Sequence, residues 1–311
     1  MSKQLDTPIL LIGFNRPDLT ARVLAQIEKI RPRKLYIAID GPRSESDRLK
    51  IVEIKKIIKQ IQGKYVVKTK FQQKNLGCKY GPVAAMNWFF KNEEMGIILE
   101  DDVLAEDSFF YFCQELLVKY KDDTRVGSIS GNNFQFGRQR GAADYYFSRY
   151  SHSCGWATWR RAWKLYDIEI SDYEEKKNVV LDNVFNKWKD RLYWKLIFRG
   201  IRSGELDTAW DYQWNWMMWK HNMLGIIPNV NLVKNIGFGR SDATHTKGGS
   251  KFENMKIEKM LLPLKHPNDV GRDFSADELT QGQNYVLWKE LIMNLVRKIY
   301  LVNRKIISLN H

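Results

Sequence analysis

Short apolar runs and helix-like segments alternate through the N-terminal third of this chain. The apolar runs break at Gly, Pro, Asn or Asp, as buried strands do, and the segments between them repeat apolar side chains at helical spacing. Regular alternation of this kind predicts an α/β fold, in which a mostly parallel central sheet is flanked by helices. The predicted strands are 8–13, 34–39, 64–71 and 95–99, and the predicted helices are 18–30, 44–61 and 81–91.

The pattern changes after this region. Aromatic residues become dense, and eleven tryptophans occur in the whole chain. We expect Trp159 and Trp163 to pack in the core, because large aromatic side chains dominate buried surface. The predicted elements are a helix at 108–120, a strand at 126–130, largely helical structure at 172–219, an extended segment at 224–232 and a C-terminal helix at 284–309.

Polar side chains follow the predicted strands where each strand ends. The carboxyl ends of parallel strands meet at one edge of a sheet, which is where open α/β sheets bind ligands. We therefore expect these side chains to form a ligand site. They are Asn15, Arg16, Asp40, Asn75, Asp101 and Asp102.

The run Glu100-Asp101-Asp102 is the most informative part of this set. Three adjacent carboxylates repel one another, so they persist at a strand end only if water solvates them or a cation gathers them. A hard cation held there also binds phosphate oxygens, which is the usual environment of Mg²⁺ or Mn²⁺ in proteins. The alternative is an acidic loop, or acidic residues near the N-terminus of the next helix.

Two common nucleotide-binding classes are excluded by spacing. The first strand ends in Gly13-Phe-Asn-Arg-Pro17, which lacks the Gly-x-Gly-x-x-Gly fingerprint of dinucleotide-binding folds. Gly63-Lys64 is followed by Tyr65, so no Walker A sequence is present and the acidic run is not the second motif of a P-loop ATPase.

The net charge of +14 indicates anionic partners. Nucleic acid is one such partner, but Lys and Arg are spread along the chain and no nucleic-acid-binding module is recognisable, so we expect no nucleic acid. The three cysteines have no paired spacing, the first residues lack the apolar core of a signal peptide, and no apolar stretch could span a bilayer. We expect a cytoplasmic protein.

Several short motifs occur in a characteristic order between Pro8 and His245. They are Phe14-Asn-Arg-Pro17, Ala38-Ile-Asp40-Gly, Glu100-Asp-Asp102, Phe109-Phe-Tyr-Phe112, Gly155-Trp156, Trp210-Asp211 and Gly237-Phe-Gly239. With them the chain resembles GT-A fold, nucleotide-sugar-dependent glycosyltransferases, and within these the bacterial relatives of the N-acetylglucosaminyltransferase I family. The resemblance implies a GT-A domain at 1–250, with a nucleotide-binding half at 1–102 and an acceptor half at 103–250. Residues 251–311 are then a C-terminal helical extension.

The resemblance also implies roles for the acidic run and the early motifs. Asp102 matches the carboxylate that binds Mn²⁺ (or Mg²⁺), Asp101 faces ribose or sugar, and Glu100 contacts the donor sugar. Arg16 and Asp40 hold the nucleotide, with Asp40 matching the acid that reads a uracil edge. Asn15 and Asn75 belong to the same nucleotide-sugar site, and Asn75-Leu-Gly77 is similar to the broader family of bacterial inverting transferases.

Four later residues complete the implied site. Asp211 matches the catalytic base, although Tyr212 stands where the family has a second acid; the alternative is a helix cap before 212–220. Gly155 gives backbone access to the donor sugar, and Trp156 walls it. His245 matches a late histidine that binds metal or diphosphate in many GT-A enzymes, although the closest eukaryotic relatives lack it.

These residues predict a metal-dependent inverting glycosyltransferase that moves a sugar from a nucleotide diphosphate sugar, UDP-linked, to a hydroxyl of a surface glycan or lipid-linked acceptor. A sugar nucleotidyltransferase is the alternative enzyme, since it also uses paired acids and a metal. The C-terminal helix either docks on its own domain, which we favour, or lies on anionic lipid at the inner face of the cell membrane.

Overall fold

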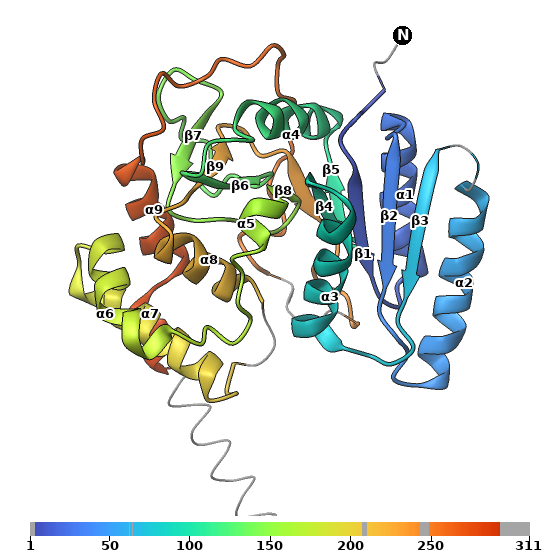
Figure 1. Ribbon diagram of the computed structural model, residues 1–311, viewed down its shortest axis with the longest axis horizontal. Coiled ribbons are helices and arrows are strands. Elements are labelled where there is room, and N and C mark those ends of the chain that lie inside the picture. Colours follow the sequence, from blue (N-terminus) through green and yellow to red (C-terminus); the bar gives the residue numbers. More distant parts are fainter. Residues whose placement is uncertain (1–3, 62, 64, 207–209, 243–248, 293–311) are drawn as a thin grey trace, which may run out of the picture. The chain divides into compact units, whose positions relative to one another are not determined.

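A computed structural model describes residues 4–61, 63, 65–206, 210–242 and 249–292 of the chain (Figure 1). These residues form two compact units. The larger unit comprises 4–168 and 210–273, and the smaller one comprises 169–206 and 274–292. The predicted GT-A domain at 1–250 and the predicted C-terminal extension at 251–311 were defined by expected function. That division stays a prediction.

The larger unit is built on an eight-stranded sheet with the strand order β3-β2-β1-β4-β8-β6-β9-β7. Strands β1 to β4 are mutually parallel, β8 and β7 run antiparallel to their neighbours, and β6 pairs with β9 in parallel. The strands are β1 (Ile9–Gly13), β2 (Lys34–Ile39), β3 (Val66–Phe71), β4 (Met95–Glu100), β6 (Val126–Ser130), β7 (Tyr145–Ser148), β8 (Trp156–Trp159) and β9 (Leu224–Pro228).

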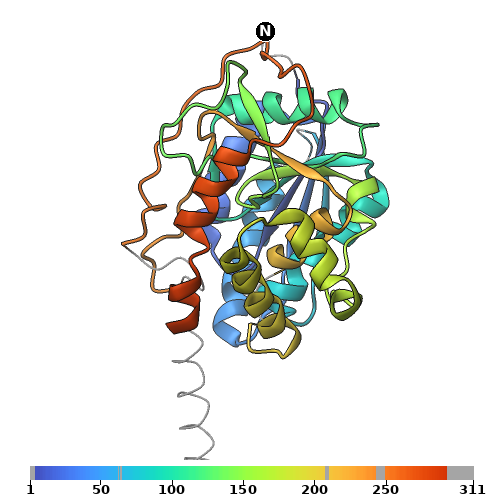
Figure 2. The same cartoon turned by 90° about the vertical axis from the view of Figure 1, so that its left-hand side faces the viewer.

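Alternate residues of the central strands enter two different hydrophobic clusters. On β1, Ile9 and Leu11 lie in one cluster, and Leu10 and Ile12 lie in the other. Because side chains of a strand alternate between the two faces, both faces of the sheet are buried. Helices α1 (Pro17–Ile30), α2 (Glu45–Ile61) and α4 (Asp107–Lys119) contribute to the first cluster, and α3 (Gly77–Asn92), α5 (Arg160–Trp163) and α8 (Asp211–Lys220) to the second. The same arrangement can be followed from the side in Figure 2.

A second, two-stranded sheet lies directly after β4. Its strands, β5 (Val103–Ala105) and β10 (Val233–Asn235), pair antiparallel, with Val103 opposite Asn235. This pairing joins the segment after the acidic run to a segment about 130 residues later in the chain. It therefore fixes the loop between β4 and β5 from both sides.

The smaller unit packs around Trp194, whose side chain is completely buried. The indole lies 4.9 Å from the ring of Tyr285 between centroids, and its Nε1–H donates to Gln281 Oε1 at 3.1 Å. The helices of this unit are α6 (Tyr173–Val184), α7 (Trp188–Arg202) and α9 (Phe274–Asn284).

The structure confirms the predicted fold class, an α/β fold with a large, mostly parallel central sheet and helices on both faces. Trp159 and Trp163 are core residues, as predicted. Two predictions about helices were wrong: α3 begins at Gly77, before the predicted start at 81, and α9 (Phe274–Asn284) was not predicted at all. A further helical stretch runs from 287 to 292, and the rest of the predicted C-terminal helix lies outside the described residues. No helix within the described part of the chain has the length and apolarity needed to cross a bilayer.

The close packing of β4 against α3 gives a stability prediction. A Cβ added at Gly96 would lie 2.2 Å from the ring of Phe89 and 2.8 Å from the backbone oxygen of Pro8. We expect Gly96→Ala to lower the free energy of unfolding by roughly 1–3 kcal/mol, because the core must shift to admit the methyl group. Chemical denaturation measures this. Gly271→Ala is the matched control, since a Cβ there meets nothing within 4 Å, and equal stability of the two variants would contradict the packing described.

Candidate active site

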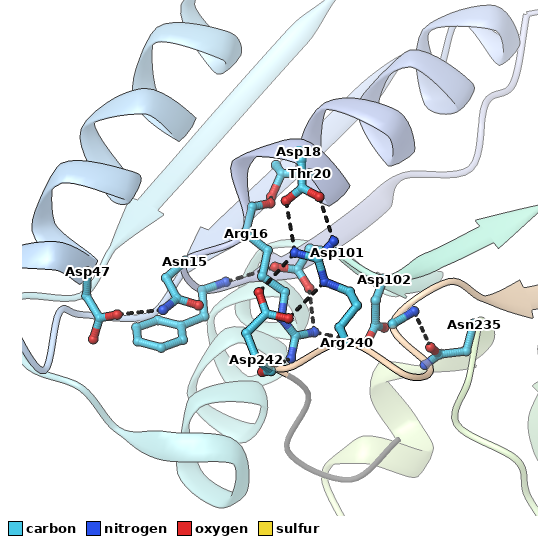
Figure 3. Close-up of polar contacts among 12 residues, drawn as sticks. Asn15, Arg16, Asp18, Thr20, Asp47, Asp101, Asp102, Asn235, Arg240 and Asp242 are labelled. Carbon is cyan, nitrogen blue, oxygen red and sulfur yellow. Dashed lines mark hydrogen bonds and ion pairs between the residues drawn. The ribbon is translucent and has the colours of Figure 1, made fainter. Parts of the chain in front are cut away.

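The acidic run lies at the carboxyl end of β4, with Glu100 as the last residue of the strand. Asp101 and Asp102 are buried residues, with 6% and 7% exposure. The β5–β10 pairing brings Asn235 beside Asp102 (Figure 3). The N–H of Ile236 donates to the backbone oxygen of Asp102 at 2.7 Å, and Gly237 lies next to the Asp102 carboxylate. Asp101 and Asp102 are therefore buried, which does not fit the alternative of a solvated acidic loop.

Arg16 is the cation that faces this group. It precedes α1, and its Nη1 lies 3.1 Å from Asp102 Oδ2 and 3.9 Å from Asp101 Oδ1 (Figure 3). The N–H of Phe14 donates to Asp101 Oδ2 at 3.2 Å. The loop after β1 and the loop after β4 therefore meet, because β1 and β4 are neighbours in the sheet.

Residues 240–242, from a late segment of the chain, lie beside Arg16 and the start of α1. Arg16 Nη2 donates to the backbone oxygen of Asp242 at 3.0 Å. Arg240 joins Asp18 in α1, with Nη1 to Oδ2 at 2.7 Å, and Asp242, with Nε to Oδ1 at 2.8 Å (Figure 3). Sequence reasoning missed Asp18, Asp242 and Asn235 as neighbours of the site; the motif Gly237-Phe-Gly239 was the signal that this segment returns to it. His245, three residues after Asp242, lies outside the described residues.

Burial raises the pKa values of all three carboxyls, and repulsion between carboxylates adds to the rise for Glu100 and Asp101. Loss of water is the largest cause for Glu100, whose pKa rises to about 8, and the charges of Asp102, Asp101 and Asp211 add to it. Loss of water and the charge of Asp102 raise the pKa of Asp101 to about 7. The pKa of Asp102 is also raised by burial, although Arg16 and the side chain of Asn235 oppose the rise. One guanidinium does not compensate for this much buried negative charge.

The chemistry of the group fits a divalent cation. Asp102 Oδ1 is buried and has no hydrogen-bond partner among the described residues. Gly237 leaves space beside the same carboxylate, since a Cβ there would lie 2.7 Å from Asp102 Oδ2. The described part of the chain contains no group of three or more His, Cys, Asp or Glu side chains arranged to hold a metal by themselves. Among the described residues, an ion at Asp102 would find few protein ligands, and substrate or water can complete the coordination of Mg²⁺ or Mn²⁺.

Asp40 and Asn75 form a separate group beside this one. The carboxylate of Asp40 accepts hydrogen bonds from the N–H groups of Gly41, Leu76 and Gly77 at 2.8–3.1 Å, and from Asn75 Nδ2 at 3.0 Å. It thereby caps the N-terminus of α3, which explains the early start of that helix at Gly77. The predicted contact of Asp40 with a uracil edge is not tested by this arrangement.

Asn15 turns toward α2. Its Nδ2 donates to Asp47 Oδ1 at 2.5 Å, and Arg43 Nε pairs with Asp47 Oδ2 at 3.0 Å. Hydrogen bonds from Arg43 and Asn15 lower the pKa of this buried carboxyl to about 2. Sequence reasoning missed Asp47, because an acidic residue in the first turn of a polar helix reads as solvated.

Asp211 is the first residue of α8 and lies close enough to Glu100 for its charge to raise the pKa of that carboxyl. The cap position is Trp210, whose side chain makes no cap hydrogen bond. Asp211 Oδ1 accepts from the N–H of Tyr212 at 3.1 Å, so the carboxylate meets an N–H of the first turn, and the roles of base and helix cap both stay predictions. The structure thus gathers Arg16, the acidic run and Asp211 at one place, from segments that are far apart in the sequence.

Gly155 and Trp156 pack against residues next to the candidate site. Gly155 has φ +64°, and its carbonyl accepts from the N–H of Gly131 at 2.8 Å. The indole of Trp156 is 1% exposed and stacks on Trp210 at 5.6 Å between ring centroids. In this structure Trp156 is a core residue that fixes the start of α8, next to Asp211.

Comparisons with known proteins do not identify a family. The chain matches no family model and no curated protein. Among solved structures it is similar to HddC from Yersinia pseudotuberculosis, at 10% identity over 50% of this chain and 77% of that one, with a TM-score of 0.32. It is also similar to the inositol-1-phosphate CTP transferase from T. maritima (10% identity, 52% and 74%, TM-score 0.31) and to a UDP-glucose pyrophosphorylase complexed with UDP-glucose (8%, 51% and 78%, 0.31). Likenesses at these TM-scores carry no argument about activity, so the function is argued from the site.

The raised pKa values predict an unusual pH dependence. Since the pKa of Glu100 is about 8 in the folded protein and 4.5 ordinarily, the folded state binds more protons than the unfolded chain between those values. The free energy of unfolding in the presence of EDTA should therefore fall as pH rises from about 5 to 8, by a few kcal/mol at most. Urea denaturation across this range measures it.

Glu100→Gln, which cannot ionise, should flatten the dependence on pH and stabilise the protein at pH 8. The control is Glu53→Gln on the exposed face of α2, which should leave the slope unchanged. A slope in Glu100→Gln as steep as in the wild type would contradict the burial of this carboxyl.

Proposed function

We propose that this protein is a metal-dependent inverting glycosyltransferase, which moves a sugar from a UDP-linked donor to a hydroxyl of a surface glycan or lipid-linked acceptor. The observation that carries the proposal is the buried carboxylate group after β4, with Arg16 on one side and Asp211 on another. Asp102 Oδ1 has no hydrogen-bond partner among the described residues, and a buried carboxylate group with such an oxygen is suited to a divalent cation.

On the donor side, Asp102 and His245 are the residues that would hold Mn²⁺ or Mg²⁺. Such an ion would supply positive charge against the negative charge of a departing diphosphate. Arg16 adds a fixed positive charge beside the same group, because its guanidinium is held by Asp101, Asp102 and the backbone of Asp242. Asp40, Asn75 and Asn15 keep the loops of the nucleotide site in place through the contacts described above.

On the acceptor side, Asp211 is the general base. The acceptor hydroxyl attacks the anomeric carbon as the bond from that carbon to the diphosphate oxygen breaks. The proton of the hydroxyl passes to the Asp211 carboxylate, and the electron pair of the broken bond stays on the nucleoside diphosphate. The stack of Trp156 on Trp210 holds the start of α8, and therefore the base, in position. Glu100 contacts the donor sugar from its place at the carboxyl end of β4.

The cellular setting belongs to the same proposal. An enzyme that extends a lipid-linked glycan works in the cytoplasm at the inner face of the membrane, and a basic protein is attracted to anionic lipid there. Four basic residues of the predicted C-terminal helix, Arg297, Lys298, Arg304 and Lys305, lie outside the described residues.

Donor binding gives the most direct test. UDP-glucose or UDP-N-acetylglucosamine at saturating concentration should raise the melting temperature by about 5 °C with Mn²⁺ and much less with EDTA. Asp102→Asn should remove the Mn²⁺-dependent part, because the carboxylate that holds the ion is gone. The control is Asp122→Asn, which neutralises a carboxylate that is 87% exposed. No shift with any sugar nucleotide would exclude the proposal.

The role of Asp211 is tested separately. Asp211→Asn should lower the rate of UDP release about 10²–10⁴-fold, with an acceptor or with water as the acceptor, since a general base contributes this much. It should keep the donor-dependent thermal shift, because Asp211 does not hold the nucleotide. Turnover at the wild-type rate would show that another group accepts the proton. Release of pyrophosphate instead of UDP would identify a sugar nucleotidyltransferase.

A further inference from the structure

A groove of about 350 Å³ runs along the outer edge of β7, the last strand of the large sheet. One wall is the segment 265–273, drawn orange-red in Figure 1, which is tied to the strand at both ends. At one end the N–H of Asp144 donates to Lys265 O at 2.9 Å, and the N–H of Lys265 donates to Asp144 Oδ2 at 2.6 Å. At the other end the N–H of Asp273 donates to Phe147 O at 2.8 Å. Between these two ends, the segment stands away from the strand, and the space between them is the groove.

The opposite wall, 140–143, is also fixed. Asn229 holds it through three hydrogen bonds: its Oδ1 accepts from the N–H of Arg140 at 2.8 Å, and its Nδ2 donates to the carbonyls of Arg140 and Ala143 at 2.8 and 2.7 Å. The guanidinium of Arg140 is held by the buried side chain of Gln135, whose Oε1 accepts from Nε at 2.8 Å and from Nη2 at 2.5 Å. The groove is therefore formed before any ligand arrives, and it presents a guanidinium in a set orientation.

The floor is aromatic and is held by a chain of hydrogen bonds. The hydroxyl of Tyr145 lies 2.7 Å from the hydroxyl of Tyr120 and 2.9 Å from His266 Nδ1. His266 Nε2 lies 3.2 Å from Glu115 Oε1, so both ring nitrogens are engaged and the imidazole is fixed at the side of the groove. The aromatic residues of the floor, Tyr145, Tyr146 and Phe147, are 1–7% exposed, so they form a closed base to the groove and the polar groups of its walls remain for a ligand rich in hydroxyl groups.

The charges of the rim indicate an anion. Arg140 and Lys265 stand on opposite walls, and Asp273 is the one carboxylate among the groove's described lining residues. Asn268 adds an amide that can donate or accept. A fixed guanidinium is well suited to a carboxylate or phosphate group, which it binds through charge-assisted hydrogen bonds.

The groove opens at the same edge of the sheet as the carboxylate group. Strand β9 runs parallel to β6, and β6 runs parallel to β4, since both pair antiparallel with β8. Tyr145 lies opposite Pro228, the last residue of β9, and therefore at the carboxyl edge. Four strand spacings separate β4 from β7, which is about 19 Å along the sheet.

We propose that this groove binds an anionic stretch of a saccharide chain and so serves as a distal subsite for the acceptor. Its assignment to the acceptor rests on the proposed transferase function, whereas the binding of an acidic saccharide rests on the groove alone. A chain that lies in the groove can extend along the sheet edge toward Asp211, because both lie at the carboxyl ends of the strands. The distance suits an acceptor of several sugar units, with the acidic unit away from the reacting hydroxyl.

The test uses the full-length protein and two α-1,4-linked hexasaccharides of equal length, hexagalacturonate, which is acidic, and maltohexaose, which is neutral. Isothermal titration at moderate salt should show saturable binding of hexagalacturonate and binding of maltohexaose at least about tenfold weaker, since one charge-assisted contact accounts for such a difference. Lys265→Ala, which removes a rim charge, and Ala142→Trp, which fills the groove from an exposed position, should each weaken hexagalacturonate binding about tenfold or more.

Matched controls separate the groove from general charge and bulk. Lys259→Ala removes an equally exposed cation outside the groove, and Leu261→Trp adds an indole at a position that is 76% exposed. Both should bind hexagalacturonate as the wild type does. Equal binding of the two hexasaccharides, loss of affinity in the controls, wild-type affinity in both groove variants, or no binding of hexagalacturonate overturns the proposal.

Failure of the groove and failure of the transferase proposal are distinguishable. The titrations contain no donor and no metal, so they do not depend on turnover. The groove variants should keep the thermal shift with UDP-sugar and Mn²⁺, because none of the altered residues contacts the carboxylate group.

Discussion

The pairing of Arg16 with the buried carboxylates after β4 is the interaction on which the candidate site depends. Three carboxyls at one strand end repel one another, and burial removes the water that would otherwise screen them. The guanidinium 3.1 Å from Asp102 offsets part of this cost, and the remainder appears as the raised pKa values of Glu100 and Asp101. The folded protein therefore contains a place where any further positive charge is stabilising. Such a place favours a divalent cation before any substrate is considered.

The central sheet holds the carboxylates together although they repel one another. Strands β1 and β4 are neighbours, and alternate side chains of both are buried in two separate clusters, so the loops that follow them cannot move apart without disrupting the core. The β5–β10 pair holds the loop after β4 from the other side, and the stack of Trp156 on Trp210 holds the first turn of α8. Strain at a functional site is maintained only when the surrounding structure over-determines it, as these three contacts do here.

Periodicity explains why the first half of the fold could be predicted. Buried parallel strands read as continuous apolar runs, and amphipathic helices such as α1 repeat apolar residues at helical spacing, so element type follows from local sequence. The convergence of Arg16, Asp101 and Asp102 followed from strand order. The partners of Asp40 and Asn15 did not, because whether a polar strand-end residue caps a helix, as Asp40 does, or binds a buried acid, as Asn15 does, depends on contacts between distant segments. Nor could sequence tell that Trp156 packs inside, since a tryptophan suits a core and a sugar site equally.

The two ends of the carboxyl edge differ in charge, and this difference has a consequence for any acidic acceptor. Near β4 the described residues gather Glu100, Asp101, Asp102 and Asp211 against Arg16, whereas the groove at β7 presents Arg140 and Lys265. The separation of about 19 Å exceeds the Debye length of about 8 Å at physiological ionic strength, so each end acts on its own part of a ligand. An acidic unit would be repelled from the carboxylate group and attracted to the groove. In the proposed reaction, a chain bound in this way would present a neutral sugar unit near Asp211, and that unit would supply the attacking hydroxyl.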